Sequence, residues 1–126
     1  MDVGLNGKCL QSVLTDYTVR LQFSDAHFVA ISSPFRLDSR AESALLSPED
    51  DTEEAFLPIR QLAGQTVDEA TADESGTLRV RFNGGTVLLV PPDDTYEAWN
   101  VSGPGGALVV STPGGALAIW TARTEP

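Results

Sequence analysis

The sequence predicts a mainly β domain, folded either as a small antiparallel sandwich or as a partly open barrel. Three observations lead to this prediction: short segments in which apolar and polar residues alternate, turns rich in Gly and Pro between them, and no helical periods alternating with the strands. The chain has 126 residues, which is the size of a single domain, residues 1–126. We expect two related β-units, a C-terminal three-stranded meander and one short helix.

An internal repeat defines the two β-units, residues 5–34 and 62–92. In each copy an alternating segment ends in a phenylalanine, Phe23 or Phe82, and is followed by a short polar link and a second apolar segment. The offset between the copies is 59 residues at these phenylalanines and 57 residues at their Leu-x-Gly starts. Each copy is therefore expected to form a strand, a turn and a β-hairpin, with a first connection that tolerates a two-residue insertion.

The strongest hairpin signal is Asn83-Gly84, because both residues tolerate the positive φ angles of a two-residue type I′ turn. Such a turn would pair Val80 with Val87 and Leu78 with Leu89. It would also leave an apolar face that needs cover from another chain, as in a homodimer, or from the protein's own helix and meander. This face comprises Val29, Ile31, Leu88 and Val90.

An acidic insert, residues 38–60, separates the two β-units. Its central part, residues 42–54, holds six acidic side chains and no basic one. Ser47-Pro48 has the form of a helix start, with a Ser cap, a Pro at the first helical position and acids in the first turn. We expect a short helix that reaches about Phe56 and has no more than about two or three turns, because Pro58 should stop or kink it.

The C-terminal segment, residues 99–122, contains a second and shorter repeat. Pro104-Gly105-Gly106 and Pro113-Gly114-Gly115 are each followed by a run of strand-forming residues, which predicts a three-stranded meander. Pairing across these turns should leave Trp120 on the outer face. The core face is expected to comprise Trp99, Val101, Leu108, Val110, Leu117 and Ile119.

The composition excludes several classes of function. Eighteen acidic against eight basic residues give a net charge of −10, which argues against nucleic-acid binding because phosphate contacts depend on Lys and Arg. With one Cys and one His, we expect no structural metal and no cofactor. Residues 1–6 do not resemble a signal peptide and no apolar run is long enough to span a membrane, so we expect a cytoplasmic protein that does not bind membranes.

The densest group of candidate ligand-binding residues follows Pro91-Pro92 and comprises Asp93, Asp94, Tyr96, Glu97 and Trp99. Adjacent carboxylates could perform acid–base work or hold a small ligand. In the structural alternative, an Asp caps a tight turn while the two aromatic residues plug the end of the core. His27 would have to join these carboxylates in a hydrolytic site, but the predicted hairpin places it opposite Gln22 on a polar strand face. No residue is assigned a catalytic role.

A second group of acids is a candidate contact surface for a protein partner: Glu49, Asp50, Asp51, Glu53 and Glu54. Their charge predicts a basic partner, and the alternative is that they only keep the protein soluble. The main functional hypothesis is therefore a non-catalytic protein-interaction module. The alternative is a small-ligand or hydrolytic site, which would require Asp93, Asp94, Glu97 and His27 to converge on one cleft.

Several motifs resemble an uncharacterised family of small actinobacterial proteins. They are the Tyr96-Glu97-x-Trp99 segment, the short Gly-Pro-Gly link, and Pro113-Gly114-Gly115 with the strand that ends in Trp120. The resemblance covers nearly the whole chain. It implies a free-standing cytoplasmic domain of unknown function, and it assigns no functional residue to this chain.

Overall fold

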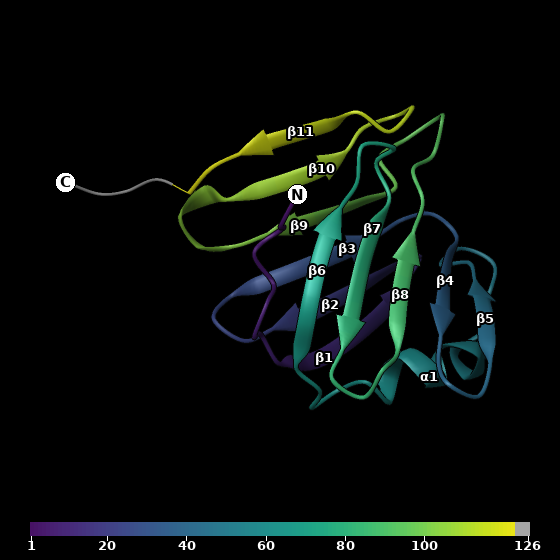
Figure 1. The fold of residues 1–126 in the computed structure, drawn as a ribbon. Helices are drawn as coiled ribbons and strands as arrows, with labels where there is room; N and C mark the ends of the chain where they lie inside the picture. Colours follow the sequence, from purple (N-terminus) through teal and green to yellow (C-terminus); the bar gives the residue numbers. More distant parts are fainter. Residues whose placement is uncertain (123–126) are drawn as a thin grey trace.

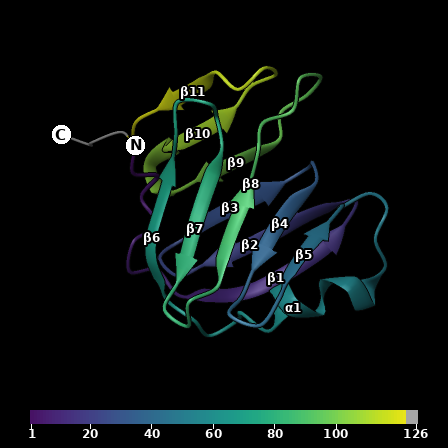
Figure 2. The same cartoon turned by 45° about the vertical axis from the view of Figure 1, so that its right-hand side comes forward.

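Two antiparallel sheets stack face to face in the computed structural model, which describes residues 1–122 (Figures 1 and 2). The strands of the six-stranded sheet are, in spatial order, β1 (Leu10–Asp16), β2 (Thr18–Phe23), β3 (His27–Ile31), β9 (Trp99–Ser102), β10 (Leu108–Ser111) and β11 (Leu117–Trp120). Those of the five-stranded sheet are β5 (Ser43–Leu46), β4 (Phe35–Asp38), β8 (Val87–Val90), β7 (Leu78–Phe82) and β6 (Val67–Ala72). The predicted mainly β class is confirmed. Of the two architectures expected, the sandwich is present, and the sheets do not close into a barrel.

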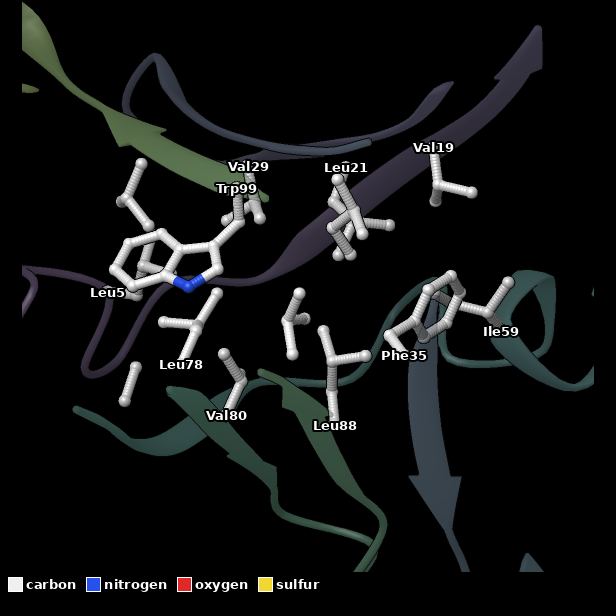
Figure 3. Packing of buried hydrophobic residues seen from close by; sticks show 14 of the residues in the cluster. Leu5, Val19, Leu21, Val29, Phe35, Ile59, Leu78, Val80, Leu88 and Trp99 are labelled. Carbon is white, nitrogen blue, oxygen red and sulfur yellow. The ribbon is translucent and has the colours of Figure 1, made fainter. Parts of the chain in front are cut away.

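The core lies between the two sheets and is built from the alternating residues that the sequence pattern predicts (Figure 3). The rings of Phe23 and Phe82, which end the alternating segments of the two units, stack with their centroids 6.4 Å apart. Burying such side chains supplies the main stabilisation of a sandwich of this size.

The two predicted copies of the repeat meet through matching contacts. Leu10 N donates to Gln65 O, and the equivalent Val67 N donates to Lys8 O. Cys9 forms an isolated β-bridge with its own equivalent, Thr66. A register irregularity also follows the first residue of both β1 and β6. Such reciprocal pairing is the arrangement that two copies of one unit would make about an approximate two-fold axis.

The expected two-residue hairpin turn is wrong. Phe82 N donates to Thr86 O and Gly85 N donates to Phe82 O, so the β7–β8 loop has three residues and ends in Gly85 with φ +95. This is a type I turn followed by a glycine bulge. The added residue shifts the register by one position, and Val80 pairs with Leu88 instead of Val87.

This register removes the apolar face that seemed to need cover. Val29, Ile31, Leu88 and Val90 all have no exposed surface, because they point into the core between the sheets. In the first unit, a three-residue loop pairs His27 with Phe23, which corrects the expected pairing with Gln22.

The C-terminal meander forms as expected, but with a different set of core residues. Val109 pairs with Val101 on one side and with Ile119 on the other. Leu108 and Val110 therefore lie on the outer face together with Trp120, and not on the core face. The cause is again a three-residue loop at each Pro-Gly-Gly turn.

The helical segment starts later than expected. Ser47 begins a turn in which Asp51 N donates to Ser47 O, and a 3-10 helix, η1 (Glu53–Phe56), leads into the α-helix α1 (Leu57–Arg60). Pro58 lies in the first turn of α1, where the missing N–H costs nothing. Contrary to the prediction, it therefore does not end the helix.

Candidate functional site

The predicted ligand-binding group lies in the loop between β8 and β9. Asp93 Oδ1 accepts hydrogen bonds from the backbone N–H groups of Thr95 and Tyr96, at 2.8 and 3.3 Å. The carbonyl oxygen of Asp93 accepts a further hydrogen bond from Gly114 N, in the β10–β11 turn, at 2.9 Å. One carboxylate oxygen of Asp93 therefore organises its own turn, as the structural alternative proposed. Asp94 and Glu97 are exposed.

Trp99 is separated from the rest of this group because its side chain is buried in the core (Figure 3). Its indole Nε1 donates to the carbonyl oxygen of Gly76 at 2.9 Å, and Ser111 Oγ donates to the same oxygen at 3.3 Å. Buried indole groups usually find such a partner. Trp99 thus holds the β6–β7 turn against the six-stranded sheet.

Two glycines allow this close approach. A Cβ atom on Gly76 would collide with the carbonyl oxygen of Gly115, and a Cβ atom on Gly115 would collide with the carbonyl oxygen of Ser75. Both glycines have positive φ angles, +91 and +99. The β6–β7 and β10–β11 turns are therefore packed backbone to backbone.

Tyr96 brings the two predicted acidic groups together. Its side chain is 40% exposed. Partial burial raises the pKa of its phenol, and the negative charges of Asp93, Glu49 and Asp50 raise this pKa further. The strand pairing agrees with this, because β5 and β8 both run antiparallel to β4 and so place the loops that follow them at the same end of the five-stranded sheet. We call Glu49, Asp50, Asp93 and Tyr96, with the adjacent exposed Asp94 and Glu97, the acidic surface.

Two of the other three predicted partner-binding acids, Glu53 and Asp51, have structural contacts. Glu53 accepts a hydrogen bond from Thr15 Oγ1 at 2.7 Å and an ion-paired one from Arg60 Nη2 at 2.8 Å. The Thr15 hydroxyl and then Arg60 lower the pKa of this carboxyl. Asp51 caps the turn that begins at Ser47, because its carboxylate accepts a hydrogen bond from the backbone N–H of Ser47. Glu54 is exposed.

His27 lies at the opposite end of β9 from the acidic surface. Strand β3 pairs with β9 so that Ile31 faces Trp99 whereas Phe28, the neighbour of His27, faces Ser102. The loop with the carboxylates precedes Trp99, and His27 packs beside Gly103, which follows Ser102. The structure therefore does not bring His27 together with Asp93, Asp94 and Glu97.

Other features bear on possible sites. Within residues 1–122, no group of three or more His, Cys, Asp or Glu side chains is arranged to hold a metal ion. In the same range no helix has the length and apolar character needed to cross a membrane. A mostly apolar pocket of about 310 Å³ lies on the five-stranded sheet between Pro34, Leu45, Leu89 and Pro91.

Sequence reasoning missed the contacts made by Arg60. Besides Glu53, its guanidinium donates to the backbone oxygen of Val13 at 3.0 Å, and so ties α1 to β1. A lone basic residue after an acidic run was the only available signal.

The fold and the acidic surface define a class: an antiparallel β-sandwich with exposed carboxylates gathered at the loops of one end. The chain belongs to the family of unknown function DUF6188, whose model matches residues 1–121. The resemblance inferred from the sequence motifs is thereby confirmed at the level of a family of unknown function. Searches of the curated proteins and of the solved structures found no significant match.

Proposed function

We propose that this protein is a non-catalytic, cytoplasmic protein-interaction module whose acidic surface binds a basic segment of another protein. The observation that carries the proposal is that β5 and β8 end at the same end of the five-stranded sheet, so the exposed acids Glu49 and Asp50 and the exposed acids Asp94 and Glu97 leave that end together. Tyr96 lies in the second of these loops, and the nearby carboxylates raise its pKa. A half-exposed tyrosine within a carboxylate surface offers both an apolar contact and a strong negative potential, and tyrosine is enriched in protein interfaces.

The charge of this surface is not compensated by the ion pairs recorded for residues 1–122. Those four pairs use Asp25, Asp38, Glu53 and Glu69. A surface of uncompensated carboxylates steers a cationic partner during its approach and repels acidic proteins. The single Cys and the resemblance to small actinobacterial proteins support the cytoplasmic location.

A small-ligand or hydrolytic site at Asp93, Asp94 and Glu97 has less support. Asp93 Oδ1 already accepts two backbone hydrogen bonds, and His27 lies at the other end of β9. General acid–base catalysis needs groups within hydrogen-bond reach of one substrate atom.

Charge reversal tests the proposal. Tagged wild-type protein and the variant Glu49→Lys/Glu97→Lys are used to capture partners from a lysate of the native host. The control is Glu42→Lys/Asp68→Lys, which reverses two exposed acids away from the acidic surface. We expect a basic protein, identified by mass spectrometry, to be captured by the wild type and the control and lost with Glu49→Lys/Glu97→Lys. Its capture should also weaken with added salt. Equal capture by all three proteins would show that the acidic surface is not the interface.

A further inference from the structure

The free edges of the two sheets differ in how they are covered. The outer edge of β6 pairs with the N-terminal segment, where the Met1 amino group donates to Ala72 O at 2.6 Å and Val3 N donates to Ala70 O at 3.3 Å. The outer edge of β1 receives the hydrogen bond from Arg60 to Val13 O. Strand β11 ends its sheet at the top of both views (Figures 1 and 2). Within residues 1–122, no backbone hydrogen bond covers its outer side, and the same holds for β5, the edge strand of the other sheet.

At β11 the core face of the six-stranded sheet extends beyond the area that the five-stranded sheet covers. Along the cross-strand row Val29, Val101, Val109 and Ile119, the exposed fractions are 0%, 3%, 7% and 50%. On the outer face Trp120 is 54% exposed and pairs with Leu108. Strand β11 therefore presents a large apolar side chain to solvent on each of its two faces, which is unusual for an unpartnered strand.

The hydrogen-bond pattern identifies the backbone groups on the free edge. Thr112 N donates to Ala116 O, so this pair is hydrogen bonded. Hydrogen-bonded pairs alternate in an antiparallel ladder, so Ala118 and Trp120 also point their backbone groups toward β10. The N–H and C=O groups of Leu117 and Ile119 then point outward, where they are free to pair.

The absence of charge distinguishes this region from the rest of the molecule. In a protein of net charge −10, the sequence from Trp99 to Ala122 contains no Asp, Glu, Lys or Arg. Proteins commonly protect an exposed edge strand with a charged residue or a proline, and Leu117–Trp120 has neither. Two copies can approach through this segment without burying a charge.

We propose that β11 pairs with β11 of a second copy of this chain, antiparallel about a two-fold axis, to join the two six-stranded sheets into one. Residues that oppose each other in such a ladder lie on the same face, so the axis passes through a residue and not between two residues. Centred on Ala118, the register pairs Leu117 with Ile119 of the second copy and Trp120 with Ala116. Centred on Ile119, it pairs Trp120 with Ala118. Either register therefore sets the largest side chain opposite an alanine.

The interface is small. Pairing of one short strand, with the side chains around it, buries less than the roughly 800 Å² per partner of a standard stable interface. We therefore expect a weak dimer that forms only at raised protein concentration, as is typical of interfaces that bury less than about 1,200 Å² in total. This surface is distinct from the acidic surface, so either proposal can fail alone.

Sedimentation velocity across a concentration series tests the dimer, from low to high micromolar. The apparent mass should double with concentration for the wild type. It should stay that of a monomer for Ile119→Lys and for Ile119→Pro, which removes an outward N–H without breaking a bond to β10. The matched control Leu45→Lys, a change to an 80% exposed leucine on the edge strand β5, should dimerise like the wild type. Thermal unfolding of dilute samples checks folding, and Ile119→Lys carries the test if the proline variant is unfolded.

A cysteine scan then defines the interface directly. Two variants are made in a Cys9→Ser background, Ile119→Cys and Ala118→Cys. The variant whose new cysteine lies on the two-fold axis should form a disulfide-linked dimer, because the two copies of that cysteine face each other. A monomeric wild type at all concentrations would overturn the proposal. So would a dimer that persists in both Ile119 variants.

Discussion

The two ends of the C-terminal meander carry similar residues but have opposite environments. At one end, the Thr112–Ala116 turn packs on the β6–β7 turn, and Trp99 lies beneath it with its indole N–H bonded to Gly76 O. At the other end, Ile119 and Trp120 are about half exposed. Both ends are apolar and uncharged in sequence. The difference arises because the facing sheet covers the meander at the first end and does not reach β11 at the other.

The comparison separates the energetic role of a residue from its type. One tryptophan is part of the core and the other is an exposed side chain on an edge strand, so equivalent substitutions should have very different effects. The following predictions run from the largest expected effect to the smallest.

The contact between the two turns should be the most sensitive point. Gly115→Val places a Cβ against the carbonyl oxygen of Ser75 at a residue with φ +99, so we expect a loss of more than about 3 kcal/mol in the free energy of unfolding. Gly114→Val is the matched control, since its φ is +87 but no atom lies within 4 Å of the added Cβ. Urea denaturation should show the larger loss for Gly115→Val. Equal losses would mean that backbone strain alone matters.

The two tryptophans should differ next. Trp99→Phe leaves a cavity and removes the indole hydrogen bond to the Gly76 carbonyl, which keeps only the 3.3 Å bond from Ser111 Oγ, so we expect a cost of about 2–3 kcal/mol. Trp120→Phe should change the stability of the monomer by less than about 0.5 kcal/mol. Chemical denaturation of dilute samples measures both values, and similar values for the two variants would contradict the assigned environments.

The β6–β7 turn should make stability depend on pH. The Ser75 hydroxyl, and then the Thr77 backbone N–H, lower the pKa of Asp73 below its ordinary value of 3.8. A carboxyl with a lowered folded-state pKa stabilises the fold above its unfolded pKa, and this contribution is lost as the pH falls through the folded value. Asp73→Asn should therefore be less stable than the wild type at neutral pH, and this difference should shrink below pH 3.8.

The matched control for that experiment is Glu74→Gln, a change at an exposed neighbour. Its stability should follow the wild type at every pH. A difference between wild type and Asp73→Asn that does not vary with pH would show that the turn hydrogen bonds do not depend on the charge of Asp73.

The smallest effect is expected at the exposed end of the meander, where Ile119 and Trp120 lie. Ile119→Thr should leave the stability of dilute protein unchanged within about 0.5 kcal/mol. At high protein concentration the wild type should melt at a higher temperature than the variant, because association stabilises the folded state by mass action. Melting curves that do not depend on concentration for either protein would indicate that this end stays free.

Much of the fold could be predicted from the sequence, because alternation of apolar and polar residues directly marks strands that are buried on one face. The registers could not be predicted. Asn83-Gly84 favours a two-residue turn, but Gly85 follows it and supplies a third residue that adopts a positive φ. The prediction followed the local turn preference of Asn83-Gly84. The observed register instead fits the packing of the core, because it buries Leu88 and Val90 between the sheets.

The candidate site was only partly foreseeable. That an Asp would cap the turn after Pro91-Pro92 and that Trp99 would fill the core followed from residue type. The proximity of Glu49 and Asp50 to Tyr96 could not be foreseen, because it depends on how the β5–η1 and β8–β9 loops meet at one end of the sandwich. Whether the acidic surface binds a partner stays a prediction.

The odd lengths of the hairpin loops have a consequence for how the family can vary. One residue separates the paired Asp16 and Thr18. At the corresponding place in the second unit, three residues separate the paired Asp73 and Thr77. The two lengths differ by two, so the strands that follow keep the same side toward the core. A single-residue insertion or deletion would turn a whole strand inside out. Aligned members of the family should therefore gain or lose residues in these loops in pairs, and unpaired gaps should fall only where a β-bulge absorbs them.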